Sequence, residues 1–172
     1  MSPVCVLVGP MGAGKTTVGE LVAARLGVPF QDTDAIIEAR AGKPIPEVFV
    51  DDGEEHFRAL ERTAVADALD AHPGVLALGG GAILADETRA RLRGHTVVFL
   101  SVELTDVMHR VGMGVGRPLL AINPRATMRY LLDQRRPLYE EVATVVVKTD
   151  GITPEGAAAA VLRALPPGDP GR

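Results

Sequence analysis

Short runs of apolar residues alternate along the chain with longer segments in which apolar positions recur every three or four residues. The first pattern is typical of buried β-strands, and the second of helices that bury one face. Strand-like runs occupy residues 4–8, 75–78, 96–101 and 144–147, with a weaker run near 28–31. Helical patterns occupy residues 14–26, 54–69, 87–92, 104–111, 125–134 and 154–165.

Strands that alternate with helices predict an α/β fold, in which a parallel β-sheet of about five strands is flanked by helices in a three-layer arrangement. Short right-handed connections then bring the carboxyl ends of the strands to one edge of the sheet, where ligands bind in such folds. A single domain is expected over residues 1–165. Residues 112–124 are broken by glycine and proline and predict a mobile loop, and the tail at 166–172 is expected to be disordered.

A phosphate-binding motif follows the first strand-like run. Residues 9–17 read GPMGAGKTT and match the pattern G-x-x-x-x-G-K-[ST] in full. The glycines of this motif let backbone N–H groups converge on a phosphate, while Lys15 reaches the β- and γ-phosphate oxygens and the Thr16 hydroxyl binds Mg²⁺. A helix N-terminus comes next and also favours a bound phosphate. A plain glycine turn would need neither Lys15 nor Thr16, so the sequence predicts a nucleotide site.

Composition narrows the class of protein. The chain has 172 residues, of which 47% are hydrophobic, and a net charge of −4 that argues against a general nucleic-acid binder. Its single cysteine, Cys5, lies in an apolar run and is expected to be a small core residue. The four histidines lack metal-ligand spacing. There is no leader-like segment and no apolar run of about 18 residues, so we expect a cytoplasmic protein without a membrane partner.

Charged residues mark the neighbourhood of the weak second strand. Asp32 and Asp34 follow it directly, and such carboxylates can support a metal ion or face an acceptor hydroxyl. Aspartate at this place is also a common cap of the next helix. Arg58 lies in a helical pattern rich in glutamate, which favours a solvated charge with partners three and four residues away. On pattern alone, Phe49 and Phe57 are ordinary core or wall residues.

Three glycines, Gly79 to Gly81, follow the strand-like run at 75–78. They leave no side chain between the backbone and a ligand, which suits a close approach to a substrate.

Two later segments carry arginines. Arg117 lies in the glycine-rich loop, from which a closing movement could bring it to the charge of a transferring phosphoryl group. Arg135 and Arg136 precede Pro137, which is expected to end or bend the helix. Either of these two arginines could bind a carboxylate through paired hydrogen bonds.

Taken together, these residues resemble shikimate kinase, a small kinase family among the phosphate-loop proteins related to nucleoside monophosphate kinases. The resemblance covers about residues 4–165 and keeps the order and approximate spacing of the family. Besides the phosphate loop, it rests on Asp32-Thr33-Asp34, Phe49, Asp52-Gly53-Glu54, Phe57-Arg58, Glu61, Gly79-Gly80-Gly81, Arg117-Pro118-Leu119-Leu120 and Arg135-x-Pro137-Leu138-Tyr139. It implies the ATP-dependent phosphorylation of the 3-hydroxyl of shikimate, a step towards the aromatic amino acids.

The resemblance also implies roles for individual residues. Contacts to ATP would come from Gly12, Ala13, Gly14, Lys15, Thr16, Thr17, Arg110, Arg117 and Pro154. Mg²⁺ would be held by Thr16 and, through water, by Asp32. Contacts to shikimate, in a substrate-binding region at about 32–62 and beyond it, would come from Asp34, Phe49, Phe57, Arg58, Gly79, Gly80, Gly81 and Arg135. Lys15, Asp34 and Arg117, the last on a lid at about 111–124, would act in catalysis.

Two other functions remain compatible with parts of this pattern. A gluconate-type kinase would share the phosphate loop and a carboxylate clamp, but is not expected to carry the whole set of motifs. A non-catalytic ATP-binding regulator would share the fold. It would be expected to have lost at least one of Lys15, Thr16, Asp34 and Arg117, all of which are present. A monomer is the default expectation.

Overall fold

The computed structural model describes residues 2–104, 106–107 and 123–167. Within these residues, five parallel strands form one sheet in the order β2-β3-β1-β4-β5. The strands are β1 (Cys5–Val8), β2 (Phe30–Asp32), β3 (Val75–Ala77), β4 (Val97–Ser101) and β5 (Val145–Lys148). The predicted α/β fold is therefore confirmed. The weak second strand begins slightly later in the chain than its apolar run.

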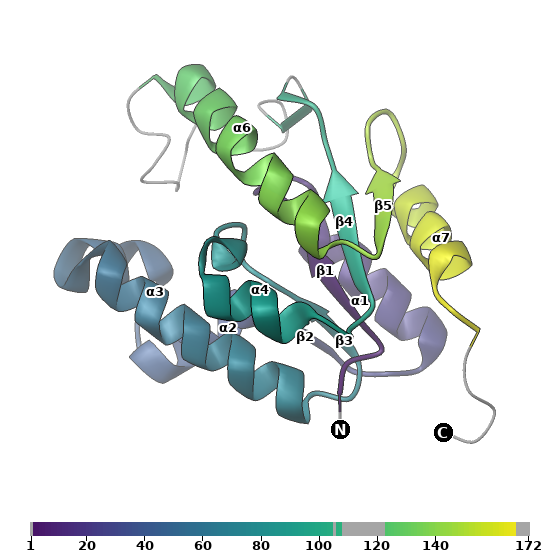
Figure 1. Ribbon diagram of the computed structural model, residues 1–172, viewed down its shortest axis with the longest axis horizontal. Coiled ribbons are helices and arrows are strands. Elements are labelled where there is room, and N and C mark those ends of the chain that lie inside the picture. The colour runs from purple at the N-terminus through teal and green to yellow at the C-terminus, as the bar shows by residue number, and fades with distance from the viewer. Residues whose placement is uncertain (1, 105, 108–122, 168–172) are drawn as a thin grey trace.

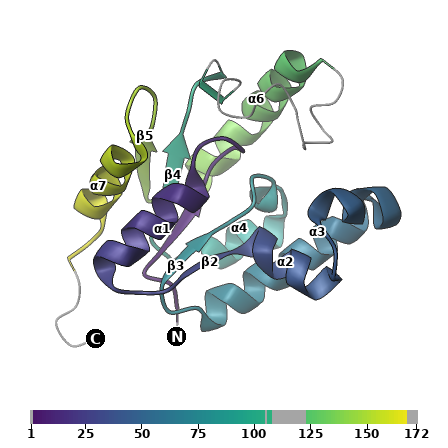
Figure 2. The same cartoon turned by 180° about the vertical axis from the view of Figure 1, so that it is seen from behind.

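Helices cover both faces of the sheet, as Figures 1 and 2 show from opposite sides. One face carries α1 (Lys15–Leu26) and α7 (Pro154–Ala164), and the other carries α3 (Ile45–Ala71), α4 (Asp86–Leu92) and α6 (Pro124–Val142). Successive residues of β1 point to opposite faces, so Cys5 and Leu7 join one core cluster while Val6 and Val8 join the other. Burial on both faces explains why this strand reads as a continuous apolar run.

A helical pair beside β2 extends the molecule on one side. It consists of α2 (Thr33–Ala41) and the first part of α3, and a small core that also includes Phe57 and Ala64 of the second part of α3 holds them together. At Gly53 the backbone leaves the helical region, with φ 86° and ψ 166°, and thereby divides α3 into two segments. The helical pattern at 54–69 predicted only the second segment, because the break at Gly53 interrupts the periodicity of the first.

The prediction that Pro137 ends or bends the helix at 125–134 is wrong about where the helix ends. Helix α6 begins at Pro124 and runs through Pro137 to Val142. A proline inside a helix costs about 3 kcal/mol through a lost hydrogen bond and a clash with the preceding turn. Residues beyond it offset that cost, because Tyr139 is only 1% exposed and packs in the core. Tertiary burial therefore outweighs the local preference.

The prediction that Cys5 is a small core residue is confirmed. Cys5 is fully buried, and that burial raises the pKa of its thiol to about 12, as suits an unreactive core residue. Across the described ranges, no helix has the length and apolar character needed to cross a membrane. The predicted helix at 104–111, the lid at 111–124 and the tail at 166–172 fall largely on residues 105, 108–122 and 168–172, which lie outside the described part of the chain.

Candidate nucleotide and substrate site

A cavity of about 750 Å³ lies at the edge of the sheet where the strands end. It is within the usual size of small-molecule sites. The predicted site residues that line it are Gly12, Ala13, Gly14, Lys15, Thr16, Thr17, Asp32, Asp34, Phe49, Phe57, Arg58, Gly79, Gly80, Gly81, Arg135 and Pro154. The two remaining predicted residues, Arg110 and Arg117, lie outside the described residues. All the described candidates therefore meet in one place, although they come from five helices, two loops and the end of β2.

The phosphate loop connects β1 to α1 in a conformation that its glycines permit. Gly12 and Gly14 have left-handed backbones, with φ of 83° and 88°, and Gly14 is the N-cap of α1. A side chain at Gly9 would place its Cβ 2.6 Å from the carbonyl oxygen of Leu100. Lys15 donates through Nζ to the carbonyl oxygens of Gly9 and Pro10, at 2.7 and 2.9 Å. The loop thus places an ammonium group and the N-terminus of α1 beside the cavity.

Asp32 connects this loop to the start of α2. Its Oδ2 accepts a hydrogen bond from the Thr16 hydroxyl at 2.8 Å, and its Oδ1 accepts one from the backbone N–H of Asp34 at 2.8 Å. The capping interpretation is therefore correct for Asp32, and the same carboxylate also contacts the phosphate loop. A hydroxyl and a carboxylate side by side are the hard oxygen ligands that Mg²⁺ prefers.

No group of three or more His, Cys, Asp and Glu side chains with metal-binding geometry occurs among the described residues. A magnesium site of the kinase type takes only one or two protein ligands and completes its shell with phosphate oxygens and water. The pair formed by Thr16 and Asp32 fits that requirement.

Asp34 lies in the first turn of α2 and packs against the glycine segment that follows β3. A Cβ at Gly79 would come within 2.6 Å of Asp34 Oδ1. The N–H of Gly79 donates to Oγ1 of the fully buried Thr33 at 3.1 Å, which holds the two segments together. Glycine at position 79 therefore makes room for the Asp34 carboxylate, a more specific requirement than the general closeness to a substrate that the sequence suggested.

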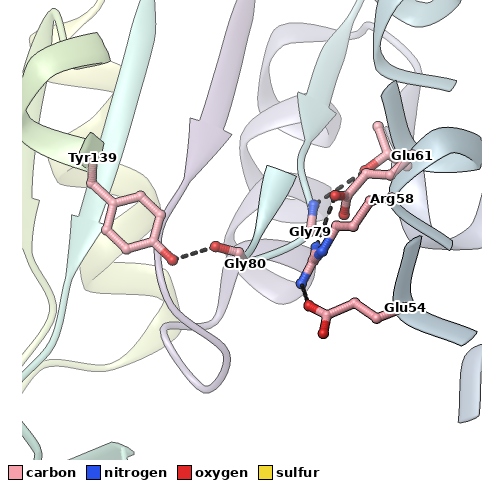
Figure 3. A network of polar contacts seen from close by, with 7 residues as sticks. Glu54, Arg58, Glu61, Gly79, Gly80 and Tyr139 are labelled. Atoms are coloured by element: carbon pink, nitrogen blue, oxygen red, sulfur yellow. Dashed lines mark hydrogen bonds and ion pairs between the residues drawn. The ribbon is translucent and has the colours of Figure 1, made fainter. Parts of the chain in front are cut away.

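Arg58 points from α3 towards the same glycine segment (Figure 3). It forms ion pairs with Glu61, at 2.8 Å, and with Glu54, at 3.5 Å, which are the helical partners that its sequence pattern predicted. Its guanidinium group also lies against Gly81, where a Cβ would come within 2.6 Å of Nη2. Arg58 lines the cavity, and among the described residues its buried Nε has no hydrogen-bond partner. Arg58 therefore forms ion pairs along its own helix and also lines the site.

Two phenylalanine rings form the wall of the cavity near Arg58. The rings of Phe49 and Phe57 lie 4.7 Å apart between centroids, and the Arg58 guanidinium lies 5.2 Å from the centre of the Phe57 ring.

The two adjacent arginines of α6 differ in their position relative to the cavity. Arg135 is 6% exposed and lines the cavity, whereas Arg136 is half-buried and does not line it. The geometry thus separates two arginines that the sequence left equivalent as carboxylate ligands.

Glu61 is a buried carboxyl group to which the sequence assigned no role in the site. It lines the cavity and is only 3% exposed. Burial raises the pKa of Glu61 above its ordinary value, and the negative charge of Asp34 acts in the same direction, against the opposing effects of Arg58 and Arg135. The sequence offered two signals for Glu61: its spacing of three residues from Arg58 and its place among the motifs of the resemblance.

Replacing Glu61 with Gln should change how the stability of the protein depends on pH. Since the folded pKa of Glu61 lies above 4.5, its contribution to stability is fully present below that pH and is lost as the pH rises through the folded pKa. The Glu61→Gln variant has no carboxyl group to titrate here. The free energy of unfolding of the variant minus that of the original protein should therefore increase as the pH rises.

Denaturant unfolding from about pH 4 to about pH 8 would measure this difference. Glu87→Gln is the matched control, because Glu87 is exposed and pairs only with the surface residue Arg62 among its described contacts. A difference between Glu61→Gln and the original protein that stays constant with pH would contradict the prediction.

Comparison with known proteins adds independent information. A family model described as shikimate kinase matches residues 11–166. A shikimate kinase of Salinispora arenicola is 66% identical over 165 residues, which cover 96% of this chain and 99% of that protein. The solved structure of a shikimate kinase from Acinetobacter baumannii in complex with shikimate has a TM-score of 0.90 and 38% identity, and covers 95% of this chain and 92% of the other.

A second kind of kinase also resembles the chain, but less closely. The structure of a gluconokinase from Sinorhizobium meliloti has a TM-score of 0.57 and 25% identity, and covers 94% of this chain and 92% of the other. Both kinds of enzyme share the arrangement of sheet and helices. The higher TM-score and identity favour the first kind.

Proposed function

This chain belongs to the shikimate kinase family, and on that basis we propose that it transfers the γ-phosphoryl group of ATP to the 3-hydroxyl of shikimate. The products are shikimate 3-phosphate and ADP, in the pathway to the aromatic amino acids. One observation supports the proposal above all. A phosphate loop, a carboxylate and two buried or half-buried arginines line the same cavity of about 750 Å³. The catalytic unit is one kinase domain over residues 1–165.

Binding of the acceptor is the task of the cationic side of the cavity. Arg58 and Arg135 hold the carboxylate of shikimate, and the backbone N–H of Gly80 adds a contact. Phe49 and Phe57 form the wall beside the ring. Guanidinium groups suit this role because they bind carboxylates through two parallel hydrogen bonds.

Catalysis by the protein is mainly positioning and stabilisation of charge, because phosphoryl transfer passes through a loose transition state. Lys15 and the loop amides hold the β- and γ-phosphates of ATP in place. Asp34 orients the 3-hydroxyl for in-line attack and accepts its proton. Arg117, on the lid, contacts the phosphates, while Arg110 and Pro154 flank adenine.

Mg²⁺ is the metal of this site, held by the Thr16 hydroxyl and, through water, by Asp32. When bound, it neutralises charge on the phosphates of ATP. The hydrogen bond of 2.8 Å between these two side chains supports the assignment, since it places the two oxygen ligands together. The enzyme is proposed to act as a cytoplasmic monomer.

Substitution of Asp32 with Asn should raise the Mg²⁺ concentration needed for half-maximal activity, because an amide is a weaker ligand and a weaker partner for metal-bound water. Asparagine still caps helices well, so α2 should remain intact. Activity would be titrated with Mg²⁺ after treatment with a chelator. The exposed Asp67, which pairs with Arg40, supplies the control variant Asp67→Asn. An unchanged Mg²⁺ requirement in Asp32→Asn would contradict the role of Asp32.

The function itself is tested by measuring ADP release from Mg-ATP with shikimate, with gluconate and with neither acceptor, and by identifying the product through mass spectrometry. ADP formed only with shikimate, together with a singly phosphorylated product, is the expected result. Activity on gluconate alone would keep the ATP site and reject the assigned acceptor. Binding of ATP without acceptor-dependent turnover would instead favour a regulatory protein.

A further inference from the structure

A tyrosine on α6 contacts the glycine segment from the side opposite Arg58. The hydroxyl of Tyr139 donates a hydrogen bond to the carbonyl oxygen of Gly80, at 2.5 Å (Figure 3). Tyr139 is 1% exposed, and its ring stacks on Phe99 with the centroids 5.0 Å apart. Packing therefore fixes the ring, and the ring in turn fixes where the hydroxyl lies.

Arg135 lies one helical turn earlier on α6, and its positive charge acts on the Tyr139 hydroxyl. It also lies beside the same glycine, because a Cβ at Gly80 would come within 3.8 Å of Arg135 Nη1. Burial raises the pKa of Tyr139 to about 12 against the opposing effect of Arg135, so the hydroxyl keeps its proton and donates it to Gly80. The hydroxyl and a cavity-lining arginine thus meet the glycine segment at the same residue.

Packing alone does not require this hydroxyl. Phenylalanine would fill the same space beside Phe99 without the cost of removing a hydroxyl from water. Tyr139 does not line the cavity, whereas its hydrogen-bond partner Gly80 and its neighbour Arg135 do. The hydroxyl therefore acts on the site through those residues.

Arg58 completes the arrangement from the other side. Its guanidinium lies against Gly81 and is paired with the buried Glu61 at 2.8 Å. The backbone of Gly80 and Gly81 thus lies between two arginines. On the α6 side, the hydrogen bond from Tyr139 fixes the Gly80 backbone beside Arg135.

We propose that Tyr139 is a positioning residue, which holds Arg135 and the Gly80 backbone in the relative placement that binds the carboxylate of the acceptor. This inference rests on the proposed function, because it assigns the carboxylate of shikimate to these groups. It predicts that the hydroxyl matters more for binding of the acceptor than for binding of ATP, because Gly80 and Arg135, which are proposed to bind the carboxylate, are its neighbours. Gly80 also lies beside the phosphate loop, where a Cβ would come within 3.3 Å of the backbone nitrogen of Met11, so both affinities have to be measured.

The test is the variant Tyr139→Phe, which keeps the ring and removes only the hydroxyl. The KM for shikimate should rise about tenfold, because the carbonyl oxygen of Gly80 loses its buried hydrogen-bond donor and the glycine is no longer fixed beside Arg135. The KM for ATP should stay within about twofold of the original value. Calorimetric titration of shikimate into the protein should show a similar loss of affinity.

Leu92→Ala is the control for loss of packing. Leu92 is 2% exposed and belongs to the same core cluster as Tyr139, but it lies on α4 and does not line the cavity. The Leu92→Ala variant should lower the midpoint of thermal unfolding at least as much as Tyr139→Phe does, while it leaves the KM for shikimate unchanged.

The two kinds of failure are distinguishable. An unchanged KM for shikimate in Tyr139→Phe would overturn the inference. So would a rise in the KM for ATP as large as the rise in the KM for shikimate, since equal rises would reflect a general loss of packing. If the original protein fails to phosphorylate shikimate at all, the proposed function is overturned before the variant is considered.

Discussion

Replacement of Asp34 with Asn is expected to lower kcat for shikimate phosphorylation by about 10²- to 10⁴-fold, the usual contribution of a general base. Asparagine keeps the size of the side chain but cannot accept a proton. Asp34 also orients the attacking hydroxyl, and its carboxylate has a defined place against Gly79, where a Cβ would come within 2.6 Å of Oδ1. The groups of the phosphate loop, including the carbonyl oxygens of Gly9 and Pro10 that accept from Lys15 Nζ, are unchanged in this variant, so ATP affinity should remain.

Steady-state kinetics and direct titration of an ATP analogue would be run on this variant side by side. Asp67→Asn serves as the control, because it makes the same chemical change at an exposed ion pair with Arg40. A loss of ATP affinity as large as the loss of kcat would reassign Asp34 to the nucleotide site.

Truncation of Arg58 to Ala should raise the KM for shikimate by about 30- to 4,000-fold. That range corresponds to the 2–5 kcal/mol typically lost when one partner of a buried charge pair is removed. Part of the loss has a structural origin, because Arg58 is also the ion-pair partner of Glu61, which is 3% exposed. The variant should therefore be less stable as well as weaker in binding the acceptor.

A double variant separates these two effects. Glu61→Gln added to Arg58→Ala removes the uncompensated buried charge and should recover stability, but it cannot restore a carboxylate ligand. Arg62→Ala is the control four residues later on the same helix, where the side chain is more exposed and pairs with Glu87. A KM for shikimate that returns to normal in the double variant would show that Arg58 acts only through Glu61.

The fold could largely be predicted from the sequence, because its signals are local. The strand at Cys5–Val8 is buried on both faces and so reads as one apolar run. Prediction was weaker where local and tertiary preferences disagree. The first part of α3, before Gly53, was not predicted as a helix. Pro137 suggested an end or bend of α6, but the helix continues through it because Tyr139 is buried in the core.

The residues of the candidate site could likewise be predicted only in part. Its cationic and acidic residues could be named from their motifs, and all those within the described ranges line the cavity. Glu61 and Tyr139 were part of the same motifs but received no role, because their significance lies in contacts with distant segments. Tyr139 reaches Gly80, and Glu61 lies beside Gly79, where a Cβ would come within 3.1 Å of Oε2.

The sequence by itself determined the phosphate loop, since nine consecutive residues, 9–17, contain every group that such a loop needs. It also determined the alternation of strands and helices that places such a loop at the edge of a parallel sheet. Only the tertiary structure decided that Arg135 rather than Arg136 lines the cavity, and that the carboxylate of Asp32 joins Thr16 as well as capping α2. The reason is physical: a periodic pattern specifies which face of a helix is buried, but the packing of separate elements specifies what that face meets.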